Sequence, residues 1–327
     1  MKKKSVLVTG IGGNVGQGIL RNIRALTQYN IKLVGCNIDS FSAGNHLCDV
    51  FYKVPYAFNE NYVKEINKII YTENIDLVIP STDYEIYYLS LNRDKLLCQV
   101  AASDVGAAEL YLDKYKSYLH HKKFNIPFAE SFLPSAYNNQ FRNIIVKPRK
   151  GRGSRGLKFN PTDMSVFNDE EFIVQKSLEG LEITTAFYVT KDRQLHGLIT
   201  LARTLHNGTT DFCYTVFQFD TQIKEIIHKI IKNTAVYGSL NIQSIVNNFG
   251  QVIPFEINCR ISGTNSIRSN FGFNDVDYTL SEYLYQTNPE MPKIIKGSAV
   301  RIYMDVVYKN TTEPDDLINN RVKNYIF

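Results

Sequence analysis

The sequence contains no tryptophan, few cysteines and no apolar run that approaches the roughly 18 residues of a membrane span. We therefore expect neither a membrane anchor nor a membrane partner. The apolar run after the N-terminal lysines is too short for a secretory signal, which predicts a cytoplasmic protein with reduced thiols. The five cysteines are odd in number and lack CxxC spacing, which argues against a disulfide framework and a structural zinc site. They are Cys36, Cys48, Cys98, Cys213 and Cys259.

The chain has little excess charge, with 37 Lys and Arg residues against 32 Asp and Glu residues and a net charge of +5. It has no arginine-rich run with interleaved aromatic residues, so we expect no nucleic-acid partner. An anionic small molecule would account for the positive excess equally well. Because 327 residues exceed the usual size of one domain, we expect two or three domains.

The first hundred residues alternate strand-like and helix-like segments, which predicts a parallel sheet with helices on both faces. The expected strands are 5–9, 31–36, 49–54 and 77–80, and the expected helices are 16–28 and 61–71. Ligands of such sheets bind at the carboxyl ends of the strands. Residues 9–16, 37–39 and 80–83 should therefore line one crevice.

After helical segments at 104–111 and 114–124, the pattern changes from α/β to α+β. Shorter strands are expected at 143–146, 172–175, 182–189 and 194–203, followed by a helix at 221–237. Residues 240–246 and 251–257 flank a turn at 247–250, which predicts a hairpin.

A glycine turn with GxxGxxG spacing lies between the first strand and the first helix, at Gly10, Gly13 and Gly16. With Asp39 at the end of the next strand, this is the context of a dinucleotide site, but Val15 interrupts the strict GxGxxG pattern. Tyr118 and Lys122 add the YxxxK spacing of short-chain dehydrogenases. An NAD-dependent dehydrogenase or epimerase is therefore one alternative, and a merely tight strand-to-helix connection is another.

The most informative segment is a β-branched strand that ends at Lys147 and runs into a loop at 149–156. This loop holds three glycines, a serine and four basic residues. Glycines let the backbone approach a polyphosphate, exposed amides donate to its oxygens, and Lys147 supplies a fixed positive charge. The GxxxxGK[ST] order of a P-loop is absent. The segment predicts a phosphate-binding loop, with a solvated basic loop as the alternative.

The predicted hairpin carries a candidate metal site. Glu256 and Asn258 alternate onto one face of the second arm, and an even register across the turn would place Gln243 on the same face. Three oxygen ligands completed by water and phosphate suit magnesium rather than zinc. The alternative is an ordinary polar face of a solvated sheet.

Lys147-Pro148 and the glycine-rich loop resemble the lid of the ATP-grasp superfamily, in particular its carbamoyl-phosphate-synthase-like carboxylate-amine ligases. The resemblance spans nearly the whole chain. Asp113-Lys114, upstream of the loop, opens a helix as the first ATP-binding lysine of that family does. It implies that Lys114 and Lys147 contact phosphate and that the loop closes as a lid. The implied nucleotide-binding residues are Lys114, Lys147, Gly153, Ser154, Gln175, Lys176, Leu178 and Glu182.

Within that resemblance, residues 172–178 correspond to the hinge strand, which contacts adenine largely through its backbone. Lys176 and Leu178 take that role, and Glu182 takes the ribose hydroxyls. Glu256 to Arg260 matches E-I-N-x-R, which implies that Gln243, Glu256 and Asn258 bind the metal. Cys259 is a spacer in this motif. The implied catalytic residues are Arg260, Arg203 and Lys147, and the candidate substrate contacts are Arg268 and Asp83.

The resemblance implies a Rossmann-like domain at 1–108 followed by a two-lobed ATP-grasp domain, with its N-terminal lobe at 109–180 and its C-terminal lobe at 181–327. It implies a ligase that uses ATP and two magnesium ions, with Mn²⁺ as an alternative, to convert a carboxylate into an acyl phosphate and join it to an amine. An ATP-dependent small-molecule kinase would use the same motifs. Both substrates are small molecules whose identity stays open, and because related ligases are often dimers, a homodimer is one option.

Overall fold

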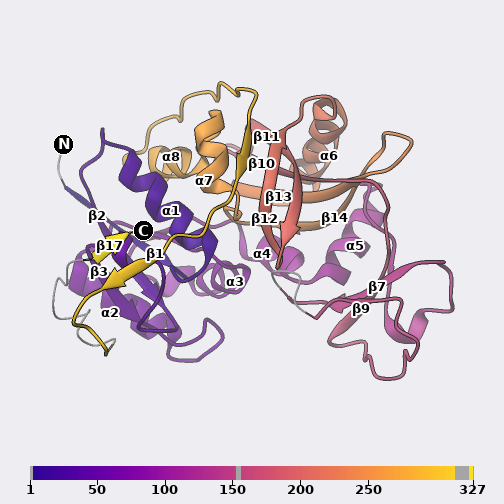
Figure 1. Ribbon diagram of the computed structural model, residues 1–327, viewed down its shortest axis with the longest axis horizontal. Coiled ribbons are helices and arrows are strands. Elements are labelled where there is room, and N and C mark those ends of the chain that lie inside the picture. Colours follow the sequence, from indigo (N-terminus) through magenta and orange to yellow (C-terminus); the bar gives the residue numbers. More distant parts are fainter. Residues whose placement is uncertain (1–2, 152–155, 314–323, 327) are drawn as a thin grey trace. The chain divides into compact units, whose positions relative to one another are not determined.

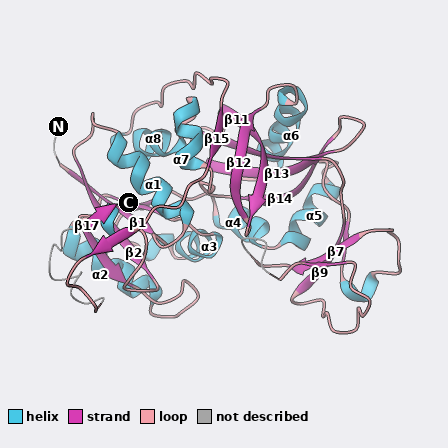
Figure 2. Ribbon diagram, in the orientation of Figure 1, coloured by secondary structure: helices cyan, strands magenta, loops and turns pink. Residues whose placement is uncertain are grey.

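The computed structural model describes residues 3–151, 156–313 and 324–326. The chain forms two compact units (Figures 1 and 2). The first contains Met1–Val105, Arg260–Ile294 and Arg301–Phe327, and the second contains Gly106–Cys259 and Ile295–Val300. The polypeptide therefore leaves the first unit and returns to it. The predicted division at 1–108, 109–180 and 181–327 remains a proposal.

The first unit is built on the predicted parallel sheet, whose strands lie in the order β3-β2-β1-β4-β5. These strands are β1 (Lys4–Thr9), β2 (Ile31–Asn37), β3 (Val50–Lys53), β4 (Leu77–Ile79) and β5 (Gln99–Val100). Val6 and Val8 pack with Ile19 of helix α1 (Asn14–Ala25), while Leu7 alternates onto the opposite face. The alternation of buried strands and helices seen in the sequence is thus confirmed.

Two further helices follow strands of this sheet, α2 (Tyr62–Glu73) and α3 (Asp83–Leu91). Helix α3 was not predicted, although a capping box begins it. The Thr82 side chain accepts from the Glu85 backbone amide, and the Glu85 carboxylate accepts from the Thr82 amide. This box fixes the first turn of α3 at the carboxyl end of β4.

The segment after Arg260 adds short helices to the first unit, namely α7 (Asn265–Arg268), η4 (Ser269–Phe271), α8 (Asp275–Thr279) and η5 (Leu280–Tyr285). Val276 and Leu280 join the same apolar core as Ile19 of α1. Asn22 of α1 donates to the Asn265 side chain at 3.2 Å. The unit also contains strands β16 (Val306–Tyr308) and β17 (Asn324–Ile326), which pair antiparallel.

The second unit contains two sheets. The four-stranded sheet has the order β6-β9-β7-β8, and the six-stranded sheet has the order β14-β13-β10-β11-β12-β15. The smaller sheet comprises β6 (Ser131–Phe132), β7 (Ile144–Pro148), β8 (Lys158–Phe159) and β9 (Phe172–Lys176). The larger comprises β10 (Leu181–Val189), β11 (Leu195–His206), β12 (Thr209–Thr215), β13 (Gly238–Val246), β14 (Val252–Asn258) and β15 (Ser298–Val300).

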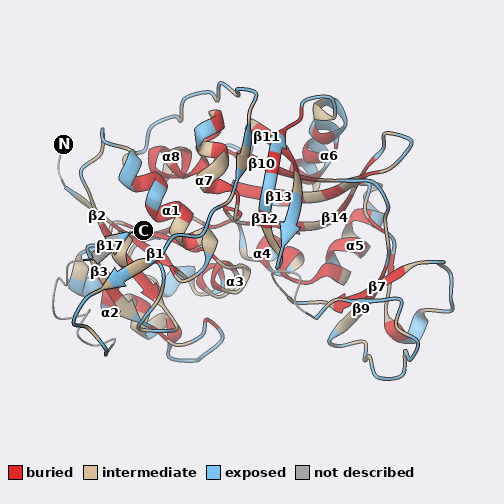
Figure 3. Cartoon of the chain, viewed as in Figure 1, coloured by how far each residue is buried: buried red, intermediate tan, exposed pale blue. Residues whose placement is uncertain are grey.

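Helices α4 (Val105–Leu112), α5 (Lys114–Lys123) and α6 (Asp220–Asn233) complete the second unit. Buried isoleucines of α6, such as Ile227 and Ile230, pack with Phe187 of β10 and Leu240 of β13. Figure 3 shows this burial along β10 and β13. Remaining short turns are η1 (Asn45–Leu47), η2 (Arg93–Lys95) and η3 (Pro134–Ala136). Within the described residues, no helix is long and apolar enough to cross a membrane.

Candidate active site

Lys147 occupies a buried position near the end of β7. Its Nζ donates to Gln175 Oε1 at 2.8 Å and to the Phe255 carbonyl at 3.3 Å, and it lies 5.5 Å from the centroid of the Phe255 ring. Burial lowers the pKa of Lys147 to about 7, and Lys114 adds to this shift while Glu256 opposes it. Its two hydrogen-bond acceptors are neutral, so an anion would be a favourable additional partner.

Lys114 is the first residue of α5 and lies close enough to Lys147 to affect its pKa. Asp113 caps this helix by accepting from the backbone amides of Tyr115 and Lys116. The Lys114 Nζ donates to the Gly151 carbonyl at 3.1 Å. The helix start therefore places the lysine against the beginning of the glycine-rich loop.

An ion pair that the sequence did not reveal joins this helix to the same loop. The Arg149 Nη2 contacts Asp113 Oδ2 at 2.7 Å, and the Arg149 carbonyl accepts from the Lys114 amide at 3.0 Å. Burial raises the pKa of Asp113, but the hydrogen bonds and charge of Arg149, together with the hydrogen bonds from the Lys116 and Tyr115 backbone amides, bring the pKa below its usual value. Gly153 and Ser154, predicted to bind nucleotide, lie outside the described residues.

The predicted hinge begins in β9, where Gln175 is buried and Lys176 is exposed. The Gln175 side chain is directed to Lys147 within the protein. Lys176 donates its backbone amide to the Glu130 carbonyl at 2.9 Å, and its Nζ lies 5.7 Å from the centroid of the Phe141 ring. Leu178 follows in the half-buried segment before β10. The adenine contacts of Lys176 and Leu178 remain predictions.

Arg203 brings together two residues that the sequence assigned to different ligands. Its Nε and Nη2 donate to Glu182 Oε1 at 2.9 and 2.7 Å, and Nη2 also donates to Gln243 Oε1 at 2.8 Å. Strand β10 lies between β11 and β13, so the three side chains extend from three adjacent strands. Glu182, the proposed ribose contact, and Gln243, a proposed metal ligand, therefore both accept hydrogen bonds from Arg203.

The three candidate metal ligands lie together on the hairpin of β13 and β14. The register pairs Gln243 directly with Glu256. Gln243 Nε2 donates to Asn258 Oδ1 at 3.3 Å, and Asn258 Nδ2 donates to Glu256 Oε1 at 3.1 Å. Because an amide oxygen has two lone pairs, it can accept a hydrogen bond and still bind a cation. The described residues contain no group of three or more His, Cys, Asp or Glu side chains able to hold a metal.

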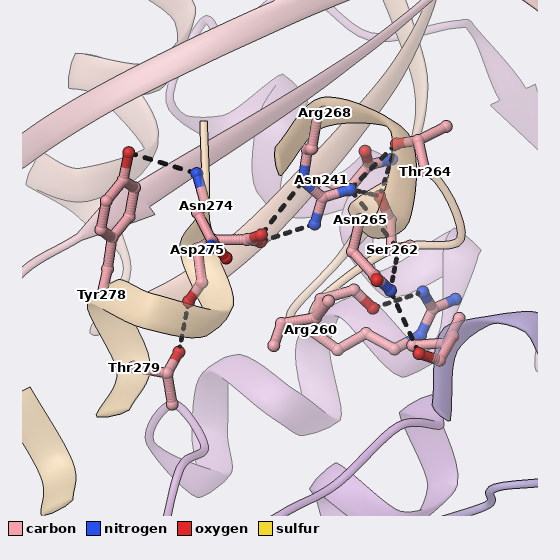
Figure 4. Close-up of polar contacts among 12 residues, drawn as sticks. Asn241, Arg260, Ser262, Thr264, Asn265, Arg268, Asn274, Asp275, Tyr278 and Thr279 are labelled. Atoms are coloured by element: carbon pink, nitrogen blue, oxygen red, sulfur yellow. Dashed lines mark hydrogen bonds and ion pairs between the residues drawn. The ribbon is translucent and has the colours of Figure 1, made fainter. Parts of the chain in front are cut away.

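Arg260 and Asp83, predicted to act in catalysis and substrate binding, form an ion pair in the first unit. Asp83 Oδ2 accepts from Arg260 Nε at 2.9 Å and lies 2.8 Å from Nη2. Arg260 also donates to the Ile261 carbonyl at 3.2 Å. The pair connects the segment after β14 to the first turn of α3, and Figure 4 shows the Arg260 guanidinium.

Arg268, the other predicted substrate contact, is fully buried. Figure 4 shows its polar contacts to neighbouring side chains. Its Nε and Nη2 donate to the two oxygens of Asp275 at 3.1 and 2.6 Å. Its Nη1 donates to the hydroxyls of Ser262 and Thr264 at 2.8 and 2.9 Å. Since every guanidinium nitrogen has a protein partner and the group is enclosed, this packing is incompatible with the predicted contact to a substrate carboxylate.

The glycine turn is explained by packing. Gly10 has a φ of +60°, and a Cβ on Gly16 would lie 2.6 Å from the Gly10 carbonyl oxygen. A Cβ on Gly18 would lie 2.1 Å from the Asn265 side chain. Tyr118 and Lys122, the dehydrogenase-like pair, belong to α5 of the second unit. The tight-connection interpretation therefore accounts for Gly10, Gly16 and Gly18, whereas a Cβ on Gly13 would make only an ordinary contact, 3.7 Å from the Gly10 carbonyl oxygen.

Two family models match the chain over most of its length. Residues 6–100 match the PylC-like N-terminal domain, and residues 111–264 match the ATP-grasp domain. None of the curated proteins matches the sequence.

Solved structures share the fold at low sequence identity. N5-carboxyaminoimidazole synthetase from Staphylococcus aureus, complexed with ADP, has a TM-score of 0.70 and 14% identity, with 88% of this chain and 78% of that chain covered. Phosphoribosylglycinamide synthetase from Anaerococcus prevotii has a TM-score of 0.65 and 17% identity, with coverages of 95% and 86%. The biotin carboxylase domain of 2-oxoglutarate carboxylase from Hydrogenobacter thermophilus has a TM-score of 0.70 and 15% identity, with coverages of 90% and 73%.

Proposed function

We propose, from the match of residues 111–264 to the ATP-grasp domain, that this chain is an ATP-dependent ligase that activates a carboxylate and joins it to an amine or similar nucleophile. The observation that carries the proposal is the set of phosphate-binding and metal-binding groups in the second unit. It holds two neighbouring lysines, Lys114 and Lys147, at the start of a glycine-rich loop, together with the oxygen ligands of the hairpin. The solved S. aureus neighbour was crystallised with ADP, which agrees with this assignment.

The proposed ATP contacts lie in the second unit. Lys114 and Lys147 neutralise phosphate charge, Lys176 and Leu178 receive the adenine, and Glu182 accepts from the ribose hydroxyls. Lysine suits this task because its ammonium is a compact charge that attracts phosphate from any direction. Burial lowers the pKa of Lys147 to about 7, and a bound phosphate would oppose this shift because a nearby negative charge favours the charged amine.

Magnesium fits the oxygen-only set of Gln243, Glu256 and Asn258, because a hard cation prefers carboxylate and amide oxygens. When bound, it would supply charge stabilisation to the phosphoryl group in transfer. The chain contributes one carboxylate and two amides, so phosphate oxygens and water would complete the coordination. Two ions are proposed, with Mn²⁺ as an alternative, and the H. thermophilus neighbour contains MgADP.

The reaction would run in two steps. A carboxylate oxygen attacks the γ-phosphorus, the bond to the ADP oxygen breaks, and an acyl phosphate forms. The amine nitrogen then attacks the acyl carbon, inorganic phosphate leaves, and the nitrogen loses a proton. Arg260 is assigned to the transferred phosphoryl group, since it follows the metal ligands in the chain, while Arg203 orients Glu182 and Gln243.

The proposal also covers the substrates, the location and the oligomeric state. Small-molecule carboxylates and amines are the substrate class, and Asp83 is proposed to border the substrate site. A cytoplasmic location and a homodimer complete the proposal. The H. thermophilus neighbour was described as a dimer in complex with bicarbonate, which agrees with both a small anionic substrate and a paired assembly.

The test is a screen of carboxylates with ATP and magnesium, run with and without hydroxylamine. A ligase produces ADP in a carboxylate-dependent manner, and hydroxylamine converts its acyl phosphate to a hydroxamate. A kinase instead produces ADP and a stable phosphorylated product that hydroxylamine leaves unchanged. Glu256→Gln, in which the metal carboxylate is lost, serves as the inactive control. Release of AMP in place of ADP would contradict the proposed chemistry.

A further inference from the structure

Lys147 has an indirect partner that no sequence motif marked, namely Ser131. Ser131 lies on β6, Gln175 on β9 and Lys147 on β7, three neighbouring strands of the four-stranded sheet. The register pairs Ser131 with Gln175, and Gln175 with Ile145, which is two residues from Lys147. The three side chains therefore lie on one face of the sheet. Their exposed fractions are only 1%, 2% and 5%.

The hydrogen bonds in this row have a fixed direction. In its charged form Lys147 can only donate, so Gln175 turns its Oε1 toward Nζ, at 2.8 Å. Gln175 Nε2 then faces Ser131 Oγ at 3.1 Å, and Ser131 Oγ donates to the Ala129 carbonyl at 3.0 Å. The serine therefore accepts from the amide because its own proton is used elsewhere. Ser131 thereby sets which end of the Gln175 amide meets the lysine.

We propose that Ser131 and Gln175 form a positioning pair that holds the Lys147 ammonium in place for a nucleotide phosphate. The inference rests on the proposed function, because it requires Lys147 to contact phosphate. A lysine has a flexible stem and three donors. Gln175 and the Phe255 carbonyl engage two of them, which leaves one directed contact for a phosphate oxygen.

The pair also explains why a neutral amide suits position 175. A glutamate there would form an ion pair with Lys147 and draw the ammonium away from phosphate. The second carboxylate oxygen of that glutamate would face the lone pairs of Ser131. It could not donate to them as the Gln175 NH₂ group does. The pair thus favours glutamine at 175 and a hydroxyl at 131, although neither residue needs to touch the nucleotide phosphates.

The test compares the affinities for MgADP and for adenosine in wild type, Ser131→Ala, Gln175→Leu and the double variant, by calorimetric titration. Loss of one buried hydrogen bond should weaken MgADP binding about fivefold in Ser131→Ala. Binding of adenosine, which has no phosphate, should be unchanged in Ser131→Ala. Because both residues act through Lys147, the double variant should bind MgADP no more weakly than Gln175→Leu. Ser90→Ala is the matched control, since Ser90 is another buried serine that donates to a carbonyl.

Additive effects of the two substitutions, an equal loss of adenosine binding, or MgADP affinity unchanged in Ser131→Ala would each overturn the inference. Failure of the wild type to bind MgADP would contradict the proposed function itself, so the two failures are distinguishable. If Ser131→Ala melts far below the wild type, Gln175→Glu, which keeps the side-chain size, answers the same question. It should weaken MgADP binding more than adenosine binding, and normal MgADP binding would again overturn the inference.

Discussion

Arg203 holds Glu182 through two N–H groups that donate to one carboxylate oxygen, at 2.9 and 2.7 Å. The same guanidinium donates to Gln243, whose amide continues to Asn258 and then to Glu256. A row of hydrogen bonds thus runs from the proposed ribose contact to the proposed metal carboxylate. Nucleotide and metal should therefore depend on one another through Arg203.

We predict that Arg203→Met weakens MgADP binding about tenfold, because hydrogen bonds to charged groups contribute about 1.5–3 kcal/mol. The magnesium concentration needed for half-maximal ADP binding should also rise, since Gln243 loses its orienting donor. Titration of ADP at several magnesium concentrations measures both effects. Arg24→Met, which removes an exposed arginine from its pair with Asp49, is the control. A normal magnesium dependence in Arg203→Met would show that the row does not couple the two ligands.

Glu256→Gln should remove most of the enhancement that magnesium gives to ADP binding while leaving the fold intact. Glu256 is the one carboxylate in the proposed ligand set, and even changes outside the direct ligands cost about 10–100-fold in metal affinity. The measurement is the ratio of ADP affinities with and without magnesium, and circular dichroism reports on the fold. Glu225→Gln, at an exposed position of α6, controls for the loss of one negative charge. A full magnesium effect in Glu256→Gln would place the metal elsewhere.

The titration of Lys147 should change the free energy of unfolding with pH. Its pKa is about 7 in the folded protein and 10.5 without the protein environment, so between these values the unfolded chain binds more protons. Stability should therefore rise with pH across this window and be lost as pH falls toward 7. Denaturant unfolding of the wild type and of Lys147→Met from pH 7 to pH 10 isolates the effect as a difference. Parallel curves for the two proteins would mean that Lys147 is charged in the fold throughout.

Arg268→Met should destabilise the protein by about 3–5 kcal/mol, because it leaves the buried Asp275 carboxylate without its counter-charge. Both side chains of this pair are fully buried. Arg24→Met should cost only about 0–1 kcal/mol, since its pair with Asp49 is exposed to solvent. Urea unfolding of the two variants provides the comparison. Equal stabilities would contradict the structural role of Arg268.

The parallel sheet and the metal hairpin could be anticipated because their signals are local. Buried strands alternate with amphipathic helices near the N-terminus, and two strand-like runs flank a short turn. The exact register of the hairpin could not be anticipated, because a register shift between Gln243 and Ser244 is what pairs Gln243 with Glu256. Strand β6, which contains Ser131, has only two residues and is defined by its pairing with β9. So short a segment carries no periodic pattern, which is why its link to Lys147 could not be predicted.

Arg268 illustrates a second limit of the sequence. An arginine near a substrate motif is typical of a binding residue, yet this one is enclosed with Asp275. The return of residues 260–294 to the first unit creates that environment, and α8 contributes Asp275. Burial of a charge depends on packing between segments distant in the chain, and local spacing does not reveal it.

The measurement that tests the central claim most directly is a calorimetric titration of the protein with a non-hydrolysable ATP analogue, with and without magnesium, alongside a titration with NAD. The proposed ATP site predicts binding of the analogue that magnesium strengthens, and no binding of NAD. Binding of NAD alone would contradict the assignment and return the active site to the glycine turn at Gly10.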